Sequence, residues 1–251
     1  PFKKLLNLGF KKFYITKYFY LNMKLSIIIP AYNEGTRIEK TLNTYLAYKW
    51  KYPIELLVVL NGCTDNTLDI VKKFSKRFKQ IRYKNLKKAS KGNALITGFK
   101  LVKGDLISYV DADNATKPSG LNYLVDNIEN YDGIIGSRWV KGAKLVKKQP
   151  LLRRILSRGF NLLVRIILGL KFRDTQCAAK VFKKKAIKSI VNKIMETNWA
   201  VDVSILYPLV RKGYKIKEVG ITWRDKPGSK LKIRKAVPNM LVAILKLRFK
   251  K

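Results

Sequence analysis

The 251 residues are enough for one large domain, or one domain with a small elaboration, around a substantial hydrophobic core. Hydrophobic residues make up 47% of the chain and aromatic residues 11%, which excludes an intrinsically disordered protein. The chain has no histidine, so Ser-His and Cys-His catalysis and His-ligated metal sites are excluded, and its two cysteines are typical of a reducing compartment. Catalysis must therefore depend on carboxylates, lysines, arginines, hydroxyls or a hard metal ion.

Positive charge dominates the sequence, with 54 lysines and arginines against 16 acidic residues and a net charge of +38. More than half of the cations lie in residues 1–22, 141–188 and 224–251, whereas most of the acids lie between residues 34 and 132. This asymmetry predicts a polyanionic partner, either an anionic membrane surface or a nucleic acid. It also indicates that the catalytic part of the molecule lies in the mixed-charge region.

Between residues 24 and 140 the apolar pattern alternates between short strands and helices. We expect strands at 25–29, 54–60, 80–83, 106–110 and 133–136, and helices at 34–48 (with Asn33 as N-cap), 67–78, 93–102 and 119–128. This alternation is typical of βαβ units, and it predicts an α/β fold with a mainly parallel, doubly wound, Rossmann-like sheet.

Polar clusters at residues 32–34, 61–65 and 111–113 follow three of the expected strands. In a doubly wound sheet, ligands bind beyond the carboxyl ends of the strands. We therefore expect the three clusters to meet at one edge of the sheet and to form the functional site.

The character of the sequence changes near Trp139. Residues 151–170 repeat leucine and isoleucine at helical spacing with arginines between them, and residues 237–251 and 2–20 have a similar pattern. Each segment alone fits either a helix in a membrane interface or a core helix with a solvated basic face, and three of them together favour the membrane surface. The longest uncharged stretch, 236–245, is too short to span a bilayer. Because the sequence begins at Pro1, the question whether a membrane anchor precedes it stays open.

Asp111 and Asp113 directly follow an expected strand. Neighbouring carboxylates repel one another unless a cation lies between them, and oxygen ligands without sulfur or imidazole suit Mg²⁺ or Mn²⁺. Such a pair also occurs in ordinary turns and helix caps, but the position at a strand end favours a metal site.

Two further features could hold a phosphate. Lys91-Gly92-Asn93 combines a cation, a flexible backbone and a helix start, although the same tripeptide also fits a simple capped helix. Arg138 follows the next expected strand and adds a guanidinium that can bind a phosphate through two hydrogen bonds.

Together these residues resemble glycosyltransferase family 2, the inverting GT-A fold, and more closely its polyprenyl-phosphate branch of dolichyl-phosphate mannose and glucose synthases. The resemblance covers residues 24–231. It rests on the segments SIIIPAYNE at 26–34, VDADNATKP at 110–118, GSR at 136–138, RILSRGFN at 154–161, DTQCAAKVF at 174–182 and RDKPGSKL at 224–231.

The resemblance implies roles for individual residues. It implies that the nucleotide is bound by Pro30, Ala31, Tyr32, Glu34, Asn61, Lys91, Asp111 and Asp113. The metal is expected to bind to Asp113 together with Asp111. The acceptor phosphate falls to Arg138, Arg153 (with Arg154 as an equal alternative), Ser157, Arg224 and Lys230, for which plain surface charge is the other interpretation. Asp111, Asp113, Arg138 and Asp202 form the expected catalytic set.

Two departures from the family pattern bear on the sugar and the metal. Asn61 stands where many relatives have an acid, and Ala115 stands where mannose synthases have an amide. A third metal ligand is then water or another residue. The segment 174–182 and Ala115 favour glucose from UDP-glucose over mannose from GDP-mannose. Asp202 lies where relatives with hydroxyl acceptors keep a base, and here we expect it to orient Arg224 or Lys230 or to form a structural salt bridge.

We therefore predict a metal-dependent inverting hexosyltransferase, peripheral to the cytoplasmic membrane face, that uses a nucleotide sugar and a dolichyl or undecaprenyl phosphate. We divide the chain into a basic leader (1–23), a nucleotide-sugar-binding half (24–140), an acceptor-side region with interfacial helices (141–235) and a basic amphipathic C-terminal segment (236–251). The alternatives are a family 2 enzyme acting on a glycan or protein hydroxyl with Asp202 as base, and a basic nucleic-acid-binding protein. A processive polysaccharide synthase would be expected to show a QxxRW motif, which this sequence does not have.

Overall fold

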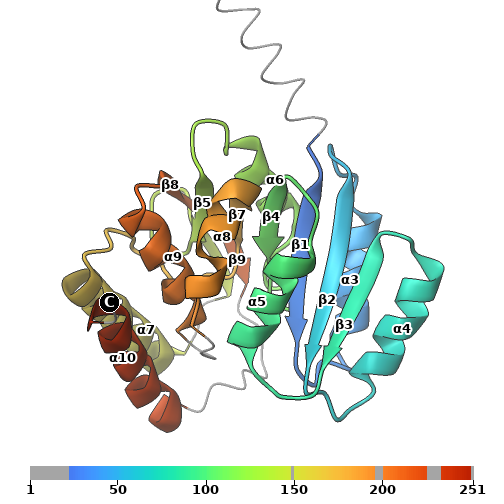
Figure 1. The fold of residues 1–251 in the computed structure, drawn as a ribbon, viewed down its shortest axis with the longest axis horizontal. Helices are drawn as coiled ribbons and strands as arrows, with labels where there is room; N and C mark the ends of the chain where they lie inside the picture. The colour runs from blue at the N-terminus through green and yellow to red at the C-terminus, as the bar shows by residue number, and fades with distance from the viewer. Residues whose placement is uncertain (1–22, 148–149, 196–199, 225–232, 250–251) are drawn as a thin grey trace, which may run out of the picture.

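A computed structural model describes residues 23–147, 150–195, 200–224 and 233–249, and a seven-stranded sheet forms its centre (Figure 1). The strands are β1 (Leu25–Ala31), β2 (Ile54–Asn61), β3 (Ile81–Leu86), β4 (Leu106–Tyr109), β5 (Gly133–Ser137), β7 (Lys180–Lys183) and β8 (Ile216–Gly220), in the order β3-β2-β1-β4-β7-β5-β8. Neighbouring strands are parallel except at β7, which is antiparallel to β4 and β5. The prediction of a mainly parallel sheet is confirmed.

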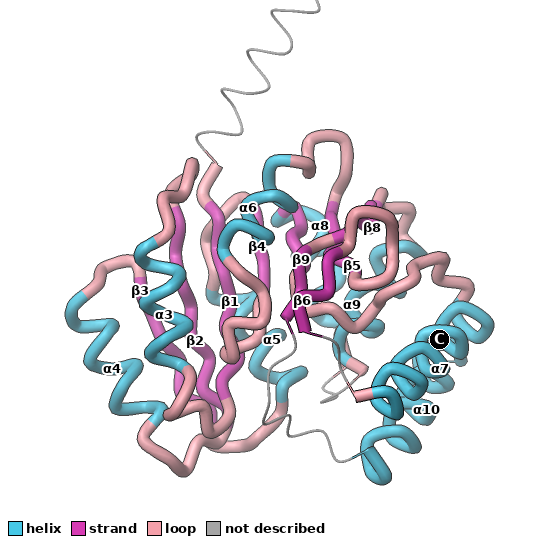
Figure 2. Tube along the Cα trace, turned by 180° about the vertical axis from the view of Figure 1, so that it is seen from behind, coloured by secondary structure: helices cyan, strands magenta, loops and turns pink. Residues whose placement is uncertain are grey.

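Two hydrophobic cores lie on the two faces of this sheet. Side chains of successive strand residues point to opposite faces, so Ile27 and Ile29 of β1 lie in one core and Ile28 in the other. The first core is covered by α3 (Ile38–Ala47), α4 (Thr67–Arg77) and α6 (Pro118–Asp126), and the second by α5 (Lys91–Leu101), α8 (Lys184–Ile190) and α9 (Val201–Arg211) (Figures 1 and 2). Burial on both faces explains the near-continuous apolar runs of β1 and β2.

The first helix begins later than expected. We predicted a helix from residue 34 with Asn33 as its N-cap, but α3 begins at Ile38 with Arg37 at the N-cap position. Asn33 adopts a left-handed backbone conformation (φ 51°), and its side chain binds the loop after β2 instead of the helix. The prediction of Asn33 as N-cap is therefore wrong, because its side chain bonds to the amide of Thr64 in the loop after β2 and not to an amide of α3.

Strand β7 was not expected, and it lies between two strands that were. The segment Lys180–Lys183 has lysines at both ends, which hides a strand from an apolar pattern, yet Lys180 is fully buried. Together with β8, it joins the sheet that residues 24–140 begin, so the sheet runs across the predicted boundary at residue 140. A separate two-stranded parallel sheet pairs β6 (Lys144–Lys147) with β9 (Thr222–Arg224).

Two long helices, α7 (Leu151–Leu168) and α10 (Ile233–Phe249), pack against one another beside α9 (Figure 1). A short 3-10 helix, η1 (Val191–Lys193), connects α8 to the segment before α9. The basic leader predicted at residues 1–23 lies, apart from Met23, outside the described residues. Within the described ranges, every helix is either too short or too polar to cross a membrane.

Candidate active site

The loops after β1 and β2 meet at the end of the sheet where the parallel strands finish, which we call the carboxyl edge (residues 31–35, 61–65, 111–113 and 137–138). The side chain of Asn33 accepts a hydrogen bond from the Thr64 amide (2.8 Å), and the Gly35 amide donates to Asp65 (3.0 Å). Asn61 is buried and its side-chain amide donates to the carbonyl of Ala31 (2.9 Å). These bonds fix the ends of β1 and β2 relative to one another.

Gly62 allows the loop after β2 to approach the start of α5. Its φ is +73°, and a Cβ at this position would lie 2.8 Å from the backbone nitrogen of Ala89. A side chain at position 62 would therefore collide with the backbone of Ala89. A residue other than glycine would also disfavour the left-handed backbone conformation that this position adopts. The close contact brings the loop that precedes Lys91 to the carboxyl edge.

Helix α3 holds the third loop, residues 111–116, in place. The hydroxyl of Thr41 donates to the carbonyl of Ala112 (2.6 Å), and the hydroxyl of Tyr45 donates to the carbonyl of Thr116 (2.9 Å). Asn114, at φ 59°, donates from its side chain to Thr44 (2.9 Å). We did not predict this role; the signal in the sequence is that Thr41, Thr44 and Tyr45 share one face of α3.

Asp111 and Asp113 lie in this loop as two partly buried carboxylates. Burial, and then the negative charge of Asp111, raise the pKa of Asp113 to about 6. One oxygen of Asp113 accepts the amide of Ala115 (2.9 Å). The pair thus has an excess of negative charge on oxygen ligands, which fits Mg²⁺ or Mn²⁺. Within the described part of the chain no group of three or more His, Cys, Asp or Glu side chains could hold a metal, so water and substrate would complete the coordination.

Lys91 reaches the same acidic pair from the start of α5. Ser90 caps this helix by accepting the amide of Asn93 (3.1 Å), which fixes the position of Lys91 at the first turn. Its ammonium lies 2.7 Å from Asp111. Burial alone would lower the pKa of Lys91, but the charge of Asp111 raises it above its ordinary value, so the lysine stays protonated.

A second layer of charges lies beneath the carboxyl edge. Asp202, in the first turn of α9, accepts hydrogen bonds from the buried Lys180 (2.5 Å) and from the hydroxyl of Tyr109 (2.6 Å). Of the two expectations for Asp202, the structure contains the salt bridge, and its partner among the described residues is Lys180. Lys230, the other expected partner besides Arg224, lies outside them. Lys180 pairs with Tyr109 in the sheet register, which explains how an antiparallel strand delivers a lysine to this edge.

Arg138 is also paired within the chain. Its guanidinium makes two hydrogen bonds to Asp174, from Nε (2.7 Å) and Nη2 (2.9 Å), and lies 5.5 Å from the centre of the Trp223 ring. Burial would raise the pKa of Asp174, but Arg138 holds it below its ordinary value. The arginine predicted for the acceptor phosphate is therefore buried at the carboxyl edge, with 8% of its surface exposed, and it is held there by a carboxylate and an aromatic ring.

The other predicted acceptor residues lie further along the chain. Arg153 and Ser157 are half-buried on α7, and Arg224 is exposed at the end of β9. Arg154 lies over the ring of Trp139 at 5.8 Å from its centre. Its Nε is buried and has no hydrogen-bond partner among the described residues. Lys230 lies outside the described residues. The choice between Arg153 and Arg154 thus stays open.

Of the residues predicted for the nucleotide, Pro30 and Ala31 end β1 and are buried, whereas the side chain of Tyr32 is 41% exposed. Glu34 forms an ion pair with Arg37 (2.7 Å) and lies close enough to Asp113 to contribute to its raised pKa. The structure thus brings the loop after β1 to the acidic pair. The roles of these residues in binding stay predictions.

A doubly wound sheet with an acidic pair and a lysine at its carboxyl edge defines a class of α/β enzymes that bind phosphorylated ligands beyond their strand ends. Residues 26–191 match the family model "Glycosyl transferase family 2". The chain belongs to this family, so the predicted family is confirmed.

Curated relatives agree with this assignment. The chain is 30% identical over 231 residues to "Glycosyltransferase AglD" of Haloferax volcanii, a match that covers 89% of the chain but 37% of that longer protein. It is 32% identical over 245 residues to a "Dolichyl-phosphate beta-glucosyltransferase" of Dictyostelium discoideum, covering 91% of the chain and 75% of the relative.

Solved structures share the fold. Glucosyl-3-phosphoglycerate synthase from Mycobacterium tuberculosis, crystallised with Mn²⁺, UDP and glucosyl-3-phosphoglycerate, superimposes with a TM-score of 0.70 at 18% identity, over 96% of this chain and 84% of that one. A fragment of TarS from S. aureus gives a TM-score of 0.59 at 23% identity, over 90% of this chain and 64% of that one. The predicted GT-A fold is confirmed.

Proposed function

We propose that this chain transfers a hexose from a nucleotide sugar to a polyprenyl phosphate such as dolichyl phosphate, with glucose from UDP-glucose preferred over mannose from GDP-mannose. The observation that carries the proposal is the acidic pair of Asp111 and Asp113 beside Lys91 at the carboxyl edge of a family 2 fold. The names of the dolichyl-phosphate glucosyltransferases to which the chain is similar support the acceptor and the sugar.

Asp113 and Asp111 would hold Mg²⁺ or Mn²⁺, which supplies positive charge to the donor diphosphate when bound. Lys91, held 2.7 Å from Asp111, adds a fixed cation at the same edge and stabilises negative charge on the leaving nucleoside diphosphate. An oxygen of the acceptor phosphate attacks C1 of the sugar from the face opposite the diphosphate. The C1–O bond to the diphosphate breaks, and the sugar leaves on the lipid phosphate with inverted configuration.

The acceptor phosphate needs positive charge because it must approach an anionic donor. Arg138, Arg153 or Arg154, Ser157, Arg224 and Lys230 are the residues we assign to it. Arg138 is the most firmly placed of these, through its two bonds to Asp174. Orientation by Asp174 lets Arg138 present a fixed charge without reorganising during the reaction.

The described structure also offers a surface for the lipid part of the acceptor. Helix α7 exposes the apolar side chains Leu151, Leu152, Ile155, Leu162, Leu163 and Ile166, and Ile166 is 70% exposed. Basic residues lie between them on the same helix. An apolar stripe flanked by cations is typical of a helix that lies in a membrane interface, and it supports a peripheral membrane position, which we assign to the cytoplasmic face as part of the proposal.

A hydroxyl acceptor with Asp202 as general base is the second candidate. A base needs an available lone pair facing the acceptor. Asp202 is buried, and it accepts both of its hydrogen bonds, from Lys180 and Tyr109, on Oδ1, so Oδ2 keeps lone pairs among the described residues. A phosphate acceptor is already ionised near neutral pH and requires no such base. The phosphate acceptor is therefore favoured by its own charge and by the names of the dolichyl-phosphate glucosyltransferases, and not by the geometry of Asp202.

A transfer assay tests the proposal. Purified protein with Mg²⁺ or Mn²⁺ is given radiolabelled UDP-glucose or GDP-mannose and dolichyl or undecaprenyl phosphate in detergent, beside Asp113→Ala and a control, Glu129→Ala, which removes an exposed acid at the opposite end of the sheet. We expect label in the lipid phase from UDP-glucose, lost only in Asp113→Ala. Metal-dependent binding of a nucleotide sugar without lipid labelling would refute the acceptor, and Asp202→Asn would then test the hydroxyl alternative.

A further inference from the structure

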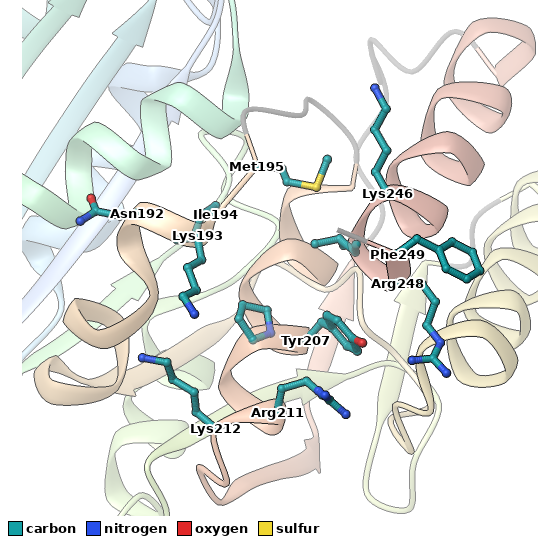
Figure 3. A pocket seen from close by; sticks show the side chains of 12 residues that line it. Asn192, Lys193, Ile194, Met195, Tyr207, Arg211, Lys212, Lys246, Arg248 and Phe249 are labelled. Carbon is teal, nitrogen blue, oxygen red and sulfur yellow. The ribbon is translucent and has the colours of Figure 1, made fainter. Parts of the chain in front are cut away.

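A pocket of about 1180 Å³ lies between η1, the C-terminal half of α9 and the end of α10 (Figure 3). Its cationic lining residues are Lys193, Arg211, Lys212, Lys246 and Arg248. Figure 3 shows the side chains of Lys193 and Lys212 extending to the same side of the pocket, with Arg211 and Arg248 beside Tyr207. Residues from the consecutive elements η1 and α9 and from the later helix α10 thus line one pocket with basic side chains.

The charge of this pocket is not balanced by the described part of the chain. Among the described residues that line it none is acidic, and no ion pair within the described ranges includes any of the five cations. Lys212 donates to the carbonyl of Ser189 (2.7 Å), which satisfies a donor but adds no negative charge. Figure 3 shows Lys246 extending away from the other four cations, whereas Lys193, Arg211, Lys212 and Arg248 lie on the remaining sides of the pocket. Their like charges repel one another, so an anion bound there would stabilise the folded protein.

Apolar surface continues from the pocket along α10. Tyr207 and Leu247 line it together with Phe249, which is 74% exposed. The same helix exposes Leu241, Val242 and Leu245. A ligand that fits both surfaces has an anionic head and a hydrocarbon tail, whereas a small soluble anion would leave the apolar part uncovered.

The pocket is separate from the proposed active site. Asp202, beneath the carboxyl edge, lies in the first turn of α9, and Arg211 lies nine residues later, about 13 Å along the helix axis. None of the residues assigned to the nucleotide, the metal or the acceptor phosphate lines the pocket. A ligand bound there does not compete with the donor for its residues.

We propose that this pocket binds the phosphate headgroup of an anionic phospholipid, with the acyl chains along the exposed apolar side of α10. Because α10 packs against α7, a lipid held here would orient the exposed side chains of α7 with respect to the same bilayer. The inference goes beyond the proposed function, since it requires neither a sugar donor nor a polyprenyl acceptor.

Vesicle binding by the purified chain tests this assignment. The pocket variant Arg211→Gln/Lys246→Gln/Arg248→Gln is compared with the control Lys72→Gln/Lys73→Gln/Lys76→Gln, which removes three exposed lysines from α4. Both lose the same charge, so a general attraction to the bilayer weakens equally in the two. On phosphatidylcholine vesicles containing phosphatidic acid, we expect the pocket variant to bind at least about tenfold more weakly than the control, from the loss of charge-assisted hydrogen bonds.

Three outcomes would overturn the proposal. Equal weakening of the two variants would mean that only overall charge acts. Binding of glycerol 3-phosphate that is lost in the pocket variant, with vesicle binding unchanged, would assign the pocket to a soluble phosphate. Loss of binding to duplex RNA alone would assign it to a nucleic acid. A melting temperature equal to or above that of the unmodified chain would show that the pocket variant is folded, because removing like charges relieves their repulsion. If the unmodified chain failed the transfer assay, the proposed function would fall but the vesicle result would stand.

Discussion

Both ends of the sheet contain buried or partly buried carboxylates, but the hydrogen bonds and charges around these carboxylates differ. At the amino end, Glu55 accepts hydrogen bonds from Ser26 (2.5 Å) and the Lys103 amide (2.9 Å) and forms ion pairs with Lys24 and Arg82. At the carboxyl edge, Asp113 accepts one backbone amide and faces another acid. The charge of Glu55 is compensated by cations within the chain, whereas the charge of Asp113 lies beside a second carboxylate. We therefore expect Glu55 to act in stability and Asp113 to act in function.

The pKa values of Glu55 and Asp113 are shifted in opposite directions. Burial would raise the pKa of Glu55, but the bond from Ser26 and then those from Lys103 and Lys24 bring it below its ordinary value. Burial and Asp111 instead raise the pKa of Asp113 to about 6. The pair of Lys180 and Asp202 lies between these cases, because it is satisfied within the chain yet stands beneath the active edge. Variants at these positions can separate the roles.

The largest effect is expected for Lys180→Met, which leaves Asp202 buried without its cation. Removing one partner of a buried ion pair costs about 3 to 5 kcal/mol, so the free energy of unfolding from urea titration should fall by this amount. Adding Asp202→Asn in the same chain removes the uncompensated charge and should recover a large part of the loss. A double variant as unstable as the single one would show that Lys180 acts through packing alone.

Asp113→Asn should have the next largest effect, and it should act on turnover. Loss of a ligand for the cation at the diphosphate should lower sugar transfer by about 10² to 10³-fold, by analogy with removal of one group that stabilises transition-state charge. The free energy of unfolding should stay constant or rise, because one of two repelling charges is gone. Comparable losses of activity and stability would place Asp113 with Glu55 as a structural acid.

Glu55→Gln should give the converse result, a loss of stability with turnover unchanged. Replacing the carboxylate weakens several charge-assisted bonds, at a cost of about 1 to 3 kcal/mol. Because the folded pKa is lowered, ionised Glu55 contributes its full stabilisation above the unfolded pKa of about 4.3, and loses it as pH falls through the folded pKa. Urea unfolding at pH values from neutral to strongly acid should show a smaller decline in the variant, and parallel curves would contradict the assignment.

The sequence predicts the first half of the fold better than the second. The strand 25–31 is apolar on both faces and stops at a polar loop, so its place and the convergence of the loops follow from local pattern. Lys180 and Asp202 could not be paired in this way, because a fully buried lysine in a strand is explained only by a partner 22 residues later. The same holds for Asn33, whose left-handed conformation depends on Thr64 across the carboxyl edge.

The smallest expected effect concerns the support of the acidic pair by α3. Tyr45→Phe removes the hydroxyl that donates to the carbonyl of Thr116 and should lower the free energy of unfolding by about 0.5 to 1.5 kcal/mol. Because this bond fixes the loop that carries Asp111 and Asp113, we also expect the Mn²⁺ concentration for half-maximal transfer to rise by about tenfold or less. Tyr123→Phe removes a hydroxyl from a half-exposed tyrosine on α6 and serves as the matched control. If Tyr45→Phe lost stability with no change in metal dependence, the hydrogen bond from α3 would be structural, and the position of Asp113 would be set by the loop itself.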